Sequence, residues 1–139
     1  MHDALKRWAR LGILEQLWAE ALLEFDDLKG LEWEWLNADG AMTKAPLGGE
    51  ATGKNPTERG KRGTKRHTLT EGQGIAIALV VSGANIPDVS RLEALLQGKL
   101  IEKPETLACP VNLCLDAGYF GADSHTLVER EGMIPHIRP

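Results

Sequence analysis

The chain has 139 residues, of which 42% are apolar, and carries a net charge of −4 at pH 7. This length suits one hydrophobic core and therefore one compact domain. No apolar run approaches the roughly 20 residues that a membrane-spanning helix needs, and the first residues lack a signal-peptide layout, so we expect a cytoplasmic protein without a membrane partner. The two cysteines have no histidine nearby, which argues against a zinc site.

The N-terminal segment predicts helices. From Trp8 to Phe25, apolar residues recur at steps of three and four, which places them on one helical stripe. Gly12 divides this stretch into a short and a longer helix, and Gly30 is a suitable helix end.

Three strands are predicted next. Leu31 to Gly40 alternates charged and aromatic residues before it turns apolar, which indicates a strand with one solvated end. Pro46 to Gly63 is rich in glycine, proline and charge, which is typical of a long functional or disordered loop. Thr64 to Leu69 and Ile75 to Val81 then form a hairpin around the turn signal Gly72 to Gly74.

The remaining chain alternates helices and strands. Asp88 is a suitable N-cap for a helix through Gln97, which Gly98 would end. Val111 to Asp116 predicts a strand, Ala122 to Glu131 a helix, and Met133 to Ile137 a final strand. The predicted fold class is α/β, with a mixed sheet built from a three-strand meander, a helix, a strand, a helix and a strand.

Positive charge is concentrated in one segment. Between Lys44 and His67 the local charge is +5, so the remainder of the chain carries −9. Dense local cations suit phosphate binding, because affinity for a polyanion depends on local charge density; a plain solvated loop is the alternative. The candidate phosphate contacts are Lys44, Lys54, Arg59, Lys61, Arg62, Lys65 and Arg66.

Two aspartates, Asp39 and Asp116, end strand-like runs. A carboxylate beside an apolar strand needs a partner, and a divalent metal ion is one such partner. Pairs of Mg²⁺ ions bridged by carboxylates catalyse phosphoryl transfer to DNA. The alternative is that each aspartate forms a turn or a cap, above all Asp39 before Gly40.

Several blocks of sequence carry a family resemblance. Leu36 to Gly49 and Gly53 to Arg66 resemble the region around the first catalytic aspartate of insertion-sequence-five type transposases, in the IS4-like superfamily. Val81 to Asn85 with Asp88, and Cys114 to Tyr119, continue the resemblance, the latter to the block of the second catalytic aspartate. Members are DDE enzymes with a ribonuclease-H-like fold, which agrees with the predicted order of elements.

The resemblance implies that Asp39 and Asp116 are the first two catalytic, metal-binding carboxylates, holding Mg²⁺ or Mn²⁺. The family's third acid, a glutamate, would lie beyond Pro139, and the N-terminal helices look clipped, so the chain resembles a piece short at both ends. Residues 1–30 would be a remnant of the DNA-binding region and residues 31–139 a partial catalytic domain with an incomplete C-terminal part. The implied partners are the DNA of the element ends and target, and an intact transposase subunit or a second copy, near the nucleoid.

Three alternatives remain. A non-catalytic remnant that binds DNA or modulates an intact transposase would explain the basic segment without the third acid. A ribonuclease-H-like nuclease of another lineage would need a third acid within this chain. Gly48 to Asn55 nearly matches a phosphate-binding loop of nucleotide hydrolases, but Asn55 replaces the required Ser or Thr and Pro56 follows, which argues against nucleotide binding.

Overall fold

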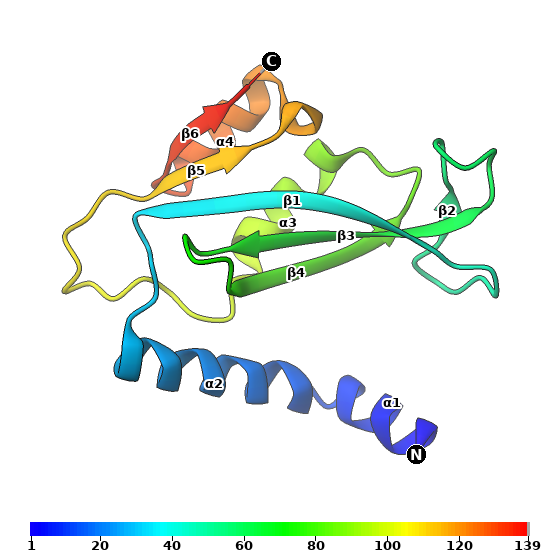
Figure 1. Ribbon diagram of the computed structural model, residues 1–139, viewed down its shortest axis with the longest axis horizontal. Helices are drawn as coiled ribbons and strands as arrows, with labels where there is room; N and C mark the ends of the chain where they lie inside the picture. Colours follow the sequence, from blue (N-terminus) through cyan, green and yellow to red (C-terminus); the bar gives the residue numbers. More distant parts are fainter. Residues whose placement is uncertain (139) are drawn as a thin grey trace.

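Six strands form one mixed sheet in the computed structural model, which describes residues 1–138 (Figure 1). In chain order they are β1 (Trp35–Lys44), β2 (Gly53–Lys54), β3 (Arg62–Thr70), β4 (Ala76–Gly83), β5 (Asn112–Leu115) and β6 (Ile134–Ile137). β3 pairs antiparallel with β1 on one side and with β2 and β4 on the other. β5 runs parallel to β1, and β6 parallel to β5. The predicted meander and the later strands are therefore confirmed.

The helices follow the predicted order. They are α1 (His2–Arg10), α2 (Ile13–Lys29), α3 (Leu92–Gln97) and α4 (Ala122–Arg130), with the 3₁₀ turns η1 (Asp88–Arg91) and η2 (Ala117–Tyr119). Gly12 separates α1 from α2 with a left-handed φ of 68°, and Gly30 ends α2 with a φ of 80°, as predicted. None of the helices within residues 1–138 is long and apolar enough to cross a membrane. The assignment of residues 1–30 to a DNA-binding region stays a prediction.

The predicted first strand begins later and runs further. β1 starts at Trp35 and continues to Lys44, because β3 offers it a partner as far as Gly63. The preceding segment instead binds the hairpin turn: the Glu32 N–H donates to Oε2 of buried Glu71 over 2.7 Å, and the Gly72 N–H donates to the Glu32 carbonyl over 3.0 Å. Sequence reasoning placed Leu31 in the strand because it did not foresee this side-chain anchor.

The sheet has one covered and one open face. On the inner face, Ala38 lies opposite Leu69, and Leu115 lies beside Ala38; all three are buried. The buried leucines of α3 join this core, and α3 and α4 lie behind the sheet in Figure 1. On the outer face, large apolar side chains stay exposed, with Trp35 at 42% and Leu79 at 44%. Within residues 1–138, therefore, no helix buries this outer face.

The predicted loop from Pro46 to Gly63 is more ordered than expected. β2 pairs with the start of β3, and between them the chain closes a turn, in which the Asn55 N–H donates to the Lys61 carbonyl over 2.8 Å. The buried Asn55 side chain accepts from the backbone and hydroxyl of Thr57. Gly53–Lys54 is thus a strand, and the next element is strand β3. A nucleotide-binding loop would lead directly into a helix, so this order agrees with its rejection.

Candidate active site

Asp39 and Asp116 lie on neighbouring strands. In the parallel pairing of β1 with β5, Ala38 lies beside Leu115, and the next residue of each chain is an aspartate. Successive side chains of extended backbone point to opposite faces, and Asp116 keeps an extended conformation (φ −77°, ψ 176°). Because Ala38 and Leu115 point inward, both carboxylates point to the open outer face.

The position of Asp39 differs from the sequence expectation. It lies in the middle of β1, not at its end, and Gly40 continues the strand. The alternative reading of Asp39 as a turn former is therefore wrong. Asp116 does directly follow its strand, as predicted, and accepts a hydrogen bond from the Gly118 N–H over 3.0 Å.

Each aspartate keeps one free oxygen. Asp39 Oδ1 accepts a hydrogen bond from the Gly40 N–H over 2.8 Å, and Asp116 Oδ1 accepts the one from Gly118. Within the described residues, neither Oδ2 has a hydrogen bond or ion pair, and both side chains are exposed. Exposed carboxylate oxygens of this kind are the ligands that Mg²⁺ and Mn²⁺ prefer.

A third carboxylate, Asp88, lies beneath these two. A Cβ built on Gly40 would be 2.8 Å from Asp88 Oδ1, and one built on Gly118 would be 2.8 Å from Asp88 Oδ2. Asp88 therefore packs directly against the residue after Asp39 and the second residue after Asp116. Since Gly40 faces inward, it approaches from the covered side of the sheet.

Asp88 is not the helix cap that the sequence suggested. Its side chain makes no capping hydrogen bond at η1, where Pro87 holds the cap position. Instead, Asp88 Oδ1 lies 3.1 Å from Lys65 Nζ and 3.4 Å from His67 Nδ1. The prediction failed because the Asp88 carboxylate pairs with the buried ammonium group of Lys65 on β3 and not with a local backbone N–H group.

Buried polar groups extend this arrangement. Lys65 Nζ also donates to the Ile86 carbonyl over 3.0 Å, and His67 Nε2 lies 2.9 Å from the Ser82 hydroxyl. Burial lowers the pKa of His67, partly opposed by Asp88. Burial also raises the pKa of the Tyr119 hydroxyl, and the negative charges of the three aspartates act in the same direction. Burial thus favours the neutral form of His67 and the protonated hydroxyl of Tyr119.

Sequence reasoning missed this inner layer, although one signal was present. Lys65, His67 and Leu69 alternate along β3, so a polar pair occupies the same face as a core leucine. Polar residues in such positions require buried partners. Those partners, Asp88 and Ser82, could not be identified without the tertiary structure.

The acids present fit a divalent ion only in part. Among residues 1–138, no group of three or more His, Cys, Asp or Glu side chains lies close enough together to hold a metal ion. Asp39 and Asp116 supply two carboxylates on one face, whereas Asp88 is engaged by Lys65 on the other side of the strand. The chain thus carries part of a carboxylate ligand set.

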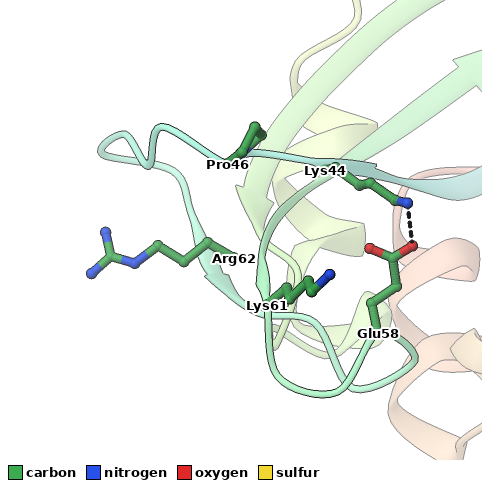
Figure 2. A pocket seen from close by; sticks show the side chains of 5 residues that line it. All are labelled: Lys44, Pro46, Glu58, Lys61 and Arg62. Carbon is green, nitrogen blue, oxygen red and sulfur yellow. Dashed lines mark ion pairs between the residues drawn. The ribbon is translucent and has the colours of Figure 1, made fainter.

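The predicted phosphate contacts lie mostly on one projection, the basic arm (residues 44–62). The arm has a hollow of about 440 Å³, and Figure 2 shows the side chains that line it. Lys44 forms an ion pair of 3.0 Å with Glu58, and its side chain remains 74% exposed. The residues that line the hollow are Lys44, Pro46, Glu58, Lys61 and Arg62. Lys54 and Arg59 are also exposed on the arm, and Arg66 is exposed on the outer face of β3.

Lys65 does not belong with this set. Its side chain is only 9% exposed, and its ammonium group is engaged by Asp88 and by the Ile86 carbonyl. Lys65 lies on the inner face of β3 and Arg66 on the outer face, because neighbouring strand residues point to opposite faces. The prediction that Lys65 contacts phosphate is therefore corrected.

Comparison with known proteins now decides the family. Residues 36–139 match the family model described as "Transposase DDE domain". The chain belongs to this transposase family. The match begins within β1, just before Asp39, and includes Asp88 and Asp116, so the whole site described above lies inside it.

A curated relative supports this membership. Over 95 residues the chain is 41% identical to a protein of Burkholderia cepacia named "Putative transposase for insertion sequence element IS402". The matched part is 62% of this chain and 42% of that relative, so the chain spans less than half the length of the curated protein it matches.

Solved structures resemble the chain more distantly. The catalytic domain of Mos1 mariner transposase has a TM-score of 0.48 at 14% identity, covering 87% of this chain and 57% of that domain. The Mos1 paired-end complex with Mn has a TM-score of 0.46 at 17% identity, covering 87% and 40%. The chain's own strand order β4-β3-β1-β5-β6 confirms the predicted α/β fold class with its mixed sheet.

Proposed function

We propose that this chain is part of a transposase that breaks and joins DNA strands with divalent metal ions, and that Asp39 and Asp116 are two of its metal ligands. The observation that carries the proposal is their placement side by side on the open face of the sheet, where each directly follows one member of the Ala38–Leu115 pair of β1 and β5. Membership of the DDE transposase family supports this assignment.

The chain's own residues have distinct tasks in this proposal. Asp39 and Asp116 would hold the metal with their carboxylates, while the Gly40 and Gly118 N–H groups orient one oxygen of each. When bound, Mg²⁺ or Mn²⁺ activates an attacking oxygen and stabilises the leaving oxygen of a phosphodiester. Asp88 is a positioning residue, because it contacts the backbone next to both ligands without facing the outer side.

DNA is the proposed partner of the basic arm. Its exposed cations and Arg66 present positive charge near an otherwise acidic body, and contacts of this kind position a DNA backbone without reading its sequence. The element ends and the target DNA are the substrates that a transposase requires. An intact transposase subunit, which would complete the ligand set, stays a predicted partner.

Metal titration tests the assignment. We expect the chain to bind Mn²⁺, measured by electron paramagnetic resonance of the free ion, and Asp39→Asn and Asp116→Asn each to weaken binding at least tenfold. Glu105→Gln is the control, because it removes an exposed carboxylate outside the site. Equal Mn²⁺ affinity in all four proteins would remove Asp39 and Asp116 from the ligand set.

A second candidate function is DNA binding without catalysis. The incomplete carboxylate set among residues 1–138 favours it. The two functions differ in metal dependence. If the chain is part of the catalytic machinery, its affinity for a transposon-end duplex should rise with Mn²⁺, and Asp39→Asn should abolish that rise. Affinity that is the same in Mn²⁺ and in a chelator, for the native chain and for Asp39→Asn, would favour the second candidate.

A further inference from the structure

The helices α1 and α2 expose far more apolar surface than they bury. α1 has no buried residue, and α2 buries only Leu22. Figure 1 shows the two helices running on in nearly the same direction along one side of the molecule. Together they are about 40 Å long, at about 1.5 Å per residue. Most of this length has no partner within the described residues.

The exposed apolar residues form a stripe. On α2, Leu14, Leu17 and Leu28 are 38%, 62% and 70% exposed. Leu14, Ala21 and Leu28 are seven residues apart, with Leu17 between them, which is the spacing by which one helix packs along another. On α1, Leu5 and Trp8 are 51% and 49% exposed and continue the uncovered surface.

Charge is divided between the two helices. α1 carries three cations against Asp3, and within residues 1–138 none of the three forms an ion pair; they are Lys6, Arg7 and Arg10. α2 carries five acids against Lys29; they are Glu15, Glu20, Glu24, Asp26 and Asp27. One half of the surface is therefore basic and the other half acidic.

We infer that this surface binds a second copy of the chain, with the two helical segments antiparallel. A two-fold axis near Leu14 and Leu17 places Leu14 of each copy against Leu17 of the other. The same axis lays α1 of each copy over the later part of α2 of the other, where Glu20 and Glu24 lie. One arrangement therefore buries the exposed leucines and also pairs the basic α1 of each copy with the acidic α2 of the other.

A nucleic-acid partner fits this surface less well. A DNA backbone along α1 would continue toward α2, whose acids repel phosphate. The basic arm offers phosphate a surface with a single acid in its hollow, Glu58. We therefore assign α1 and α2 to protein association and leave DNA to the arm.

Sedimentation equilibrium of the 139-residue chain, without DNA or metal, tests the inference. We expect a reversible dimer at micromolar concentration. The double variant Leu14→Glu/Leu17→Glu should raise the dissociation constant at least tenfold. Leu23→Glu is the matched control: Leu23 is 55% exposed, and nine residues after Leu14 it lies on the opposite side of a helix with 3.6 residues per turn. Circular dichroism checks that each variant remains folded.

Charge reversal tests the antiparallel arrangement separately. Arg7→Glu/Arg10→Glu and Glu20→Arg/Glu24→Arg should each weaken the dimer, and their combination should restore it, because the charges are then exchanged and complementary again. Restoration in the combined variant supports the arrangement, and failure to restore overturns it.

Other outcomes overturn the inference but leave the proposed function unaffected. If the chain stays monomeric at every concentration, it does not bind a second copy of itself. If it is monomeric and Arg7→Glu/Arg10→Glu lowers affinity for a DNA duplex, α1 belongs to the DNA surface. The Mn²⁺ titration of Asp39 and Asp116 is independent of both results.

Discussion

Lys65 and Asp88 form an ion pair of 3.1 Å on the covered side of the sheet, next to the strand that carries Asp39 on its open side. The pair joins strand β3 to the start of η1 and brings the Asp88 carboxylate against Gly40 and Gly118. The two proposed metal ligands therefore lie above a charged pair, in which Lys65 is buried and Asp88 is partly exposed.

Removing the cation of this pair should destabilise the fold. In Lys65→Met the Asp88 carboxylate loses its partner in a largely buried position, so we expect the free energy of unfolding to fall by roughly 3 kcal/mol, measured by urea denaturation. Arg66→Gln, the next residue on the exposed face, should change it by less than about 0.5 kcal/mol. A Lys65→Met variant as stable as the native chain would contradict a structural role for the pair.

Gly40 should not tolerate a side chain. A Cβ there would meet Asp88 Oδ1 at 2.8 Å, so Gly40→Ala must displace Asp88 or bend β1. We expect a loss of about 1 to 3 kcal/mol in unfolding free energy, together with weaker Mn²⁺ binding because Asp39 is adjacent. Gly121→Ala serves as the control, since a Cβ at Gly121 meets nothing within 4 Å and its backbone is extended. Equal effects at both positions would argue against this close approach.

Stability should depend on pH through His67. Its pKa is lowered by burial from the ordinary value of 6.5, so the unfolded chain binds more protons than the folded chain at mildly acidic pH. By linkage, this contribution to stability is present above pH 6.5 and is lost as the pH falls from 6.5 toward the lowered pKa. Urea denaturation across this range should show that the free energy of unfolding changes less with pH for His67→Gln than for the native chain. The exposed His2→Gln control should retain the native slope.

Glu58, in the hollow of the basic arm, should limit DNA affinity. Glu58 pairs with Lys44 over 3.0 Å, so Glu58→Gln frees a cation and removes a negative charge from the hollow. Fluorescence anisotropy should show tighter duplex binding, with the slope of log affinity against log salt steeper by about 0.9 for one added phosphate contact. Lys44→Gln should have the reverse effect. If the salt dependence of DNA affinity is unchanged in both variants, DNA does not contact this hollow.

Several features of this protein follow from sequence alone. The helical stripe from Trp8 to Phe25, the meander and the later alternation of helices and strands were all predictable, because hydrophobic periodicity and glycine turns are local signals. Asp116 was located correctly at the end of its strand for the same reason. The basic segment was also evident, since charge clustering along a chain needs no fold to be seen.

The tertiary structure alone decided which face each residue occupies and what lies beneath it. The pairing of β1 with β3 as far as Gly63 places Asp39 inside a strand, and the pairing with β5 sets it beside Asp116. Lys65 and Arg66 look alike in sequence, yet one is buried against Asp88 and the other is exposed. The physical reason is that strand register and long-range ion pairs join residues far apart in the chain, and a local pattern carries no information about which partner will be there.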